Sequence, residues 1–264
     1  MFRTIYIIAL IVIYLLFFTT SCNSYNFTEM SDGNIIVNGT KLKFENEQKL
    51  YKKISNEFIL KVSSADIFIK NTASDRVEAA VKYYEYADGD AELFFEDHRI
   101  ESKTKSGKDI YISEVHLRIP YNIDFEVSCG SGDIEAEEMK DMRNIELETG
   151  SGDFYLGNLD SNKQITLETG SGDIEIVDGN DNERMLFSTG SGDISLDRIN
   201  KVRFVKIGTG SGDIDINDCA FLKFNFTVGS GDVELNNSEI QYLDYSIGNG
   251  DLENNNTTIY SREK

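Results

Sequence analysis

Seven aspartates recur at nearly constant spacing, and their carboxylates are the groups in this sequence best suited to bind a cation. Six end a Gly-Ser-Gly-Asp motif and the seventh ends Gly-Asn-Gly-Asp, at intervals of 20, 20, 20, 20, 19 and 19 residues. They are Asp133, Asp153, Asp173, Asp193, Asp213, Asp232 and Asp251. In stacked turns about 4.8 Å apart, neighbouring carboxylates would repel by roughly 1 kcal/mol even in water.

Such a column either binds cations weakly or is stabilised by hydrogen bonds from turn N–H groups or the motif serines. Calcium-binding β-rolls use a nine-residue period with an Asp in every half-turn, and this sequence has neither feature. We therefore predict that the seven aspartates form a structural turn ladder, with weak cation binding as the alternative.

A second set of carboxylates lies two residues after five of the motif aspartates, at Glu135, Glu175, Asp215, Glu234 and Glu253. Paired carboxylates can cleave sugars by acid–base chemistry, and β-helices can carry such pairs on an outer face. Tyr155 and Ser195 interrupt the series, so we interpret it as a solvated charged face.

No other catalytic or cofactor pattern stands out. The two histidines, His98 and His116, have no Cys/His spacing that suits zinc, and the glycine motif is followed by neither a lysine nor a helix pattern. Cys129 and Cys219 lie about four repeats apart, too far to form a disulfide within one chain. We predict no catalytic residue, no metal site and no cofactor.

The segments around each motif alternate apolar and polar residues, as in Ile145–Thr149 before it and Ile174–Ile176 after it. Alternation of this kind indicates strands with one buried face, and a 20-residue period indicates stacked copies of one unit. The sequence predicts an all-β, single-stranded parallel β-helix with coils of about 20 residues, right-handed by the crossover rule. Ile134, Phe154, Ile174, Ile194, Ile214, Val233 and Leu252 should form one inward ladder.

Five regions follow from these patterns. We expect a signal peptide at 1–21, a lipidated tether at 22–30, irregular N-terminal β-helix rungs and a cap at 31–120, regular repeats at 121–253, and a polar cap or tail at 254–264. Ser31–Val37 and Ser63–Ile69 look like degenerate copies of the repeat unit.

The first 22 residues predict export and lipidation. Arg3 precedes an unbroken apolar run from Ile5 to Phe18, which is short for a membrane span but suits a signal peptide. Small residues then lead to Cys22, as in the lipobox of bacterial lipoproteins, although Thr19 stands where that motif usually has an aliphatic residue. We expect a lipid on Cys22 to hold an extracytoplasmic protein on the cell envelope or cell surface.

The net charge of −20 excludes nucleic acid as a partner, because an acidic surface repels phosphates. The membrane, reached through the N-terminal lipid, and a glycan or an envelope or surface protein are the partners we expect.

The segment His116–Val127, running into Gly130–Asp133, resembles the bacterial "putative adhesin" β-strand-repeat family, which is related to head-GIN auto-transporter adhesins. The resemblance covers roughly residues 31–255 and is most specific at the repeats. It implies a parallel β-helix, export and often a lipid anchor, and it brings no catalytic residues.

These observations predict a non-enzymatic, adhesin-like surface scaffold or binding module. Two alternatives stay open: an envelope-stress accessory lipoprotein that binds a protein partner, and a β-helix enzyme acting on polysaccharides.

Overall fold

The computed structural model describes residues 27–29 and 35–263, and all regular structure in them is β-strand. The expected signal peptide, Cys22 and most of the tether lie outside the described residues. Within those residues, no helix is long and apolar enough to cross a membrane.

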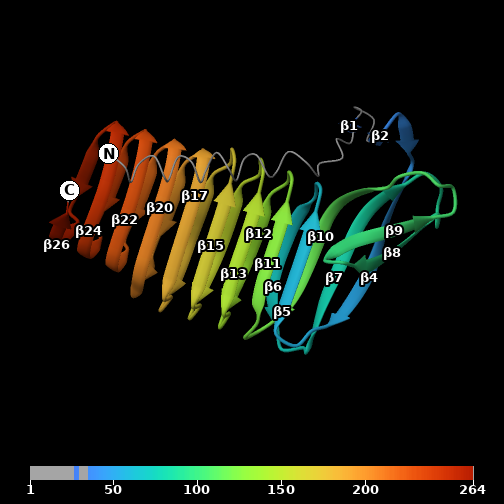
Figure 1. Cartoon of the computed structure of the whole chain (residues 1–264), viewed down its shortest axis with the longest axis horizontal. Helices are drawn as coiled ribbons and strands as arrows, with labels where there is room; N and C mark the ends of the chain where they lie inside the picture. The colour runs from blue at the N-terminus through green and yellow to red at the C-terminus, as the bar shows by residue number, and fades with distance from the viewer. Residues whose placement is uncertain (1–26, 30–34, 264) are drawn as a thin grey trace.

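The molecule is a rod built from two long sheets that face each other along its axis (Figure 1). We call the twelve-stranded sheet sheet 1 and the eleven-stranded sheet sheet 2. The parallel part of sheet 1 contains β6 (Asp66–Thr72), β12 (Ile134–Lys140), β14 (Phe154–Asp160), β16 (Ile174–Asn180), β18 (Ile194–Asp197), β19 (Ile199–Asn200), β21 (Ile214–Asn217), β23 (Val233–Asn236) and β25 (Leu252–Asn255). The parallel part of sheet 2 contains β5 (Glu57–Val62), β11 (Asp124–Cys129), β13 (Asn144–Thr149), β15 (Gln164–Thr169), β17 (Arg184–Ser191), β20 (Val202–Ser211), β22 (Ala220–Ser230), β24 (Glu239–Asn249) and β26 (Thr258–Glu263).

Each coil contributes one strand to sheet 2 and the next to sheet 1, with the glycine motif at the corner between them. Ile174 of one coil pairs with Ile194 of the next, and both side chains are buried. The predicted parallel β-helix with coils of about 20 residues is therefore confirmed, as a two-sheet β-solenoid.

The core is a set of ladders between the two sheets. The ladder from Ile134 to Val233 is buried, and Leu252 in the last coil is partly exposed. Opposite it, the inner face of sheet 2 supplies residues such as Leu147, Leu167 and Phe187. Full burial of each aliphatic side chain contributes about 1.5–3 kcal/mol, so the repeated ladders stabilise the stack along its length.

The N-terminal part differs from the expected series of wide rungs. Only one true coil precedes the regular repeats, formed by β5 and β6 with the corner Ser63–Asp66. The chain then leaves the stack and returns at β11, beside β5.

Beyond this coil, most strand pairs are antiparallel. β4 (Phe44–Lys53), β7 (Arg76–Glu85) and β10 (Tyr111–Pro120) extend sheet 1, and the hairpin of β8 (Ala91–Glu96) and β9 (Arg99–Thr104) extends sheet 2. β10 pairs antiparallel with β7 on one side and parallel with β6 on the other. The tight turn between β8 and β9 has positive φ at Asp97 and His98, a backbone that closes a hairpin.

The two chain ends also differ in detail from expectation. Ile35–Val37 forms β2 in a small antiparallel sheet with β1 (Phe27–Glu29) and β3 (Thr40–Leu42), so it is not a rung of the stack. Of the expected polar tail, Asn254 and Asn255 end β25, and Thr258–Glu263 forms β26, which extends sheet 2 by one more parallel strand.

Candidate binding groove and polar ladders

The motif aspartates form one continuous hydrogen-bonded column along the corner of the rod. The Oδ1 atom of each aspartate from Asp66 to Asp232 accepts the backbone N–H of the aspartate in the next coil, at 2.7 to 3.1 Å. The donor is thus a turn N–H group, but it belongs to the neighbouring coil rather than to the same turn. The column starts one coil earlier than the motif, at Asp66, which accepts from Asp133.

Stacking this close requires glycine on the same corner. A Cβ atom at Gly152 or Gly172 would lie 1.9 Å from the carbonyl oxygen of the glycine one coil below. The glycines therefore allow backbone to approach backbone, as the repeat requires.

Two further polar ladders line the interior. Thr149, Thr169, Thr189 and Thr209 are buried, and each hydroxyl donates to a glycine carbonyl oxygen at 2.9 to 3.1 Å. At the opposite corner, the amide oxygens of Asn162 and Asn182 accept N–H groups from the preceding coil at 3.0 Å. This asparagine ladder was not predicted from the sequence, although Asn162 and Asn182 lie 20 residues apart.

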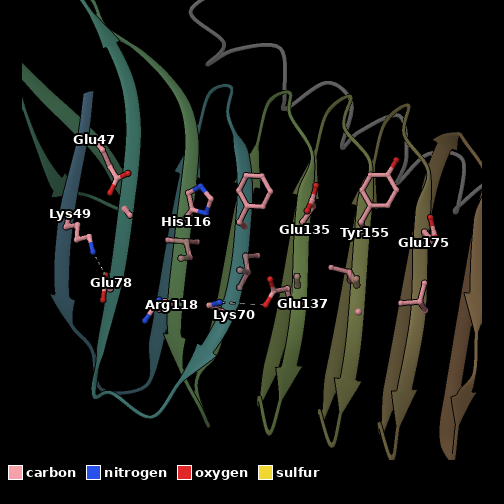
Figure 2. A pocket seen from close by; sticks show the side chains of 18 residues that line it. Glu47, Lys49, Lys70, Glu78, His116, Arg118, Glu135, Glu137, Tyr155 and Glu175 are labelled. Atoms are coloured by element: carbon pink, nitrogen blue, oxygen red, sulfur yellow. Dashed lines mark ion pairs between the residues drawn. The ribbon is translucent and has the colours of Figure 1, made fainter. Parts of the chain in front are cut away.

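The outer face of sheet 1 holds a groove of about 550 Å³, where the antiparallel strands meet the parallel ones (Figure 2). Its central row crosses seven adjacent strands in register. In order from β4 to β16, the row is Lys49, Ala80, His116, Phe68, Glu135, Tyr155 and Glu175.

Aromatic rings and carboxylates alternate along this central row. The rings of Phe68 and His116 are stacked, with centroids 4.6 Å apart. Glu135 separates them from Tyr155, which is 42% exposed and whose hydroxyl lies 3.2 Å from Asp153 Oδ2. Glu175 follows on the other side of Tyr155.

Charged pairs border the groove. Lys49 pairs with Glu78 at 3.6 Å and Lys70 with Glu137 at 3.7 Å, and Arg118 lies between these pairs (Figure 2). At one edge, Glu114 accepts from Lys82 at 2.7 Å and contacts His116 Nε2 at 2.8 Å. These two hydrogen bonds, first from Lys82 and then from His116, lower the pKa of Glu114.

The predicted carboxylate series divides between two environments. Glu135 and Glu175 line the groove, whereas Asp215, Glu234 and Glu253 continue the same row farther along the rod. Burial, followed by repulsion from Glu234, raises the pKa of Asp215.

The remaining candidates lie elsewhere. His98 is exposed in the β8–β9 turn. Cys129 and Cys219 are buried, and burial raises both thiol pKa values, that of Cys219 to about 12, so neither side chain has the character of a thiolate nucleophile. Within the described ranges, no three His, Cys, Asp or Glu side chains are grouped to hold a metal ion.

The sequence profile described as Toastrack DUF4097 matches this chain twice, over residues 51–183 and 159–262. The chain belongs to the Toastrack family. The two matches overlap at residues 159–183 within the regular coils and together extend from β4 to β26, and they confirm the resemblance to an adhesin-repeat family. No curated protein matches the chain.

Solved structures share the fold of this Toastrack protein at low sequence identity. A "putative adhesin" from Parabacteroides merdae has 12% identity and a TM-score of 0.51, covering 86% of this chain and 98% of its own. A "putative lipid binding protein" from Parabacteroides distasonis has 17% identity and a TM-score of 0.51, covering 83% of this chain and 97% of its own.

Proposed function

We propose that this protein is a non-enzymatic, adhesin-like binding module, held on the outer side of a membrane by a lipid on Cys22, and that its sheet 1 groove binds a glycan. The central row of the groove supports the proposal. Aromatic rings offer apolar faces to the C–H groups of a sugar, and carboxylates beside them accept hydrogen bonds from its hydroxyl groups.

The charged side chains of the groove indicate which sugars it would favour. Both lysines that line the groove are paired with glutamates, whereas Glu135 lies between Phe68 and Tyr155, and Glu175 lies on the other side of Tyr155. Carboxylates in this position favour neutral or amino sugars over acidic ones, since an acidic sugar would be repelled. The names of two proteins that share the fold, an adhesin and a lipid-binding protein, agree with a binding role.

Calorimetry of the full chain in detergent, against neutral, amino and acidic oligosaccharides, tests the groove. We expect a neutral or amino sugar to bind, and Tyr155→Ala to weaken its binding at least tenfold. Tyr242→Ala is the matched control, because Tyr242 is an exposed tyrosine on sheet 2. Equal binding by both variants, or no binding by any sugar, would contradict the proposal.

The lipid anchor has a separate test. The N-terminal peptide of protein purified from membranes should begin at Cys22 and carry the mass of acyl chains, and Cys22→Ala should release the protein into the soluble fraction. Membrane retention of that variant would count against the anchor without affecting the groove.

One observation supports a second candidate function. Glu135 and Glu175 lie two strands apart, about 9–10 Å at sheet spacing, close to the separation of roughly 6.5–9.5 Å in enzymes that invert sugar configuration. Reducing ends released from the bound oligosaccharide, and lost in Glu135→Gln, would favour this enzyme over the binding module.

A further inference from the structure

Six neighbouring strands in the middle of sheet 2 form an outer face with two halves of opposite charge. Strands β11, β13 and β15 present five carboxylates and no basic side chain there: Asp124, Glu126, Glu146, Glu148 and Glu168. Strands β17, β20 and β22 present four exposed basic side chains and no acidic one: Arg184, Arg203, Lys206 and Lys223, of which Arg203 pairs with Glu183. These six strands lie side by side along the rod (Figure 1).

Little within the chain balances these charges. Lys61 pairs with Glu126 and Arg143 with Asp124. Among the described residues, Glu146, Glu148, Lys206 and Lys223 have no ion-pair or hydrogen-bond partner, so each half keeps an uncompensated charge.

Gly208 is a second observation on the same face. It lies inside β20 without positive φ, and a Cβ atom there would meet no heavy atom within 4 Å, unlike the motif glycines. The residues paired with Gly208 on the two adjacent strands, Ser188 and Thr227, are also small. We call the line of paired residues across these strands the Gly208 row. A glycine that neither a turn nor close packing requires often marks the approach of another backbone or ligand. In the acidic half, the Gly208 row continues through Glu168 and Glu148.

We propose that a second copy of this chain docks on this face, with the two rods antiparallel about a two-fold axis that runs along the strands between β15 and β17. This axis places β13 opposite the partner's β20, in the same row. Glu146 then meets Lys206 of the partner subunit, and Glu148 extends over the partner's Gly208. A two-fold interface repeats each contact, so one charged pair counts twice.

The size of the face sets the strength of the dimer. The six strands lie about 4.8 Å apart, and about six residues of each, at roughly 3.3 Å rise, span the face, which therefore measures about 29 by 20 Å. Both partners together would bury roughly 1,100–1,200 Å², near the lower limit for a specific interface. The dimer is therefore weak, concentration-dependent and sensitive to salt.

Sedimentation of the full chain in detergent, over a range of concentrations, tests this interface. Wild-type protein should dimerise reversibly, less so at high salt. Glu146→Lys or Lys206→Glu alone should weaken the dimer at least tenfold, because each places like charges opposite one another at two positions. Asp215→Lys makes the same charge change on sheet 1 and should leave dimerisation as it is.

The charge exchange identifies the partner surface. Glu146→Lys combined with Lys206→Glu should restore dimerisation, since the pair is re-formed with its charges reversed. Gly208→Val should weaken the dimer without lowering the melting temperature of the monomer, because the new side chain enters open space. A monomer at every concentration, a dimer insensitive to both single charge changes, or a double variant that stays monomeric would overturn the proposal.

Discussion

At the scale of single residues, the motif aspartate joins one coil to the next. Asp173 Oδ1 accepts the N–H of Asp193 at 2.8 Å, while the carboxylates above and below it repel its charge. A hydrogen bond to a charged acceptor contributes about 1.5–3 kcal/mol, and like charges at this spacing cost roughly 1 kcal/mol per neighbour in water. The acceptor atom therefore matters more than the charge.

Two substitutions separate these effects. Asp173→Ala should lower the free energy of unfolding by about 1–2 kcal/mol, because it leaves the Asp193 N–H without its partner. Asp173→Asn keeps an oxygen acceptor and removes the repulsion, so it should equal or exceed the wild type. Urea unfolding followed by circular dichroism measures both, and an alanine variant as stable as the asparagine variant would contradict this role for the carboxylate.

Glu148 makes stability depend on pH. Burial, with added repulsion from Glu168, Glu146 and Glu126, raises its pKa from 4.5 to about 6. Between these values the folded chain binds more protons than the unfolded chain, so this group makes the fold less stable as pH rises through that window.

Glu148→Gln should therefore stabilise the chain at pH 7.5 by about 1 kcal/mol, after allowance for solvent screening, and have almost no effect near pH 4. Thermal unfolding at several pH values, at concentrations low enough to keep the chain monomeric, measures the difference. A constant difference between the two proteins across that range would rule out titration of Glu148 as its cause.

At the scale of elements, the close approach of coils at the glycine corner sets the geometry of every repeat. Gly172→Ala places a methyl group 1.9 Å from a carbonyl oxygen, so the coils must separate locally and lose ladder hydrogen bonds. We expect a loss of at least about 2 kcal/mol in unfolding free energy. Gly208→Ala is the control, since its methyl group meets nothing, and a comparable loss in both variants would show that contact with the coil below is not the cause.

The regular coils could be predicted from sequence because each needs the same residues at the same spacing. The strands around β7 and β10 could not, since alternation identifies a strand but not the direction of its neighbour. The groove could not be predicted either, because it forms where these strands pair with β6. Phe68 lies between His116 and Glu135 only because β6 pairs with strands that begin more than 40 residues later in the chain. Ser63–Ile69 was identified as a degenerate copy of the repeat unit, but Asp66 was not predicted to join the aspartate column, because serine and alanine replace the two glycines of its corner.

At the scale of the whole molecule, the charge of −20 is spread over a rod with carboxylates repeated along several rows. Self-repulsion of this kind weakens the compact state, and salt screens it over about 10 Å at 0.1 M. The melting temperature should therefore rise as sodium chloride increases from low to moderate concentration. Calorimetric scans at concentrations low enough to keep the chain monomeric provide the measurement, and a falling melting temperature would mean that attractive ion pairs dominate instead.

The aspartate column has a direction, and Asp251 is its last member: its N–H donates to Asp232, and within the described residues no further aspartate N–H donates to its own carboxylate. The carboxylate of Asp251 could therefore accept the N–H of an added turn, as each earlier aspartate accepts the N–H of the turn after it. An extra 20-residue unit copied from the middle of the chain should fit without disturbing its neighbours and lengthen the particle by about 4.8 Å. A unit of 17 or 23 residues should not, since every later ladder would lose its register. Length is thus a property that gene duplication can change in whole steps, while the groove at the other end stays as it is.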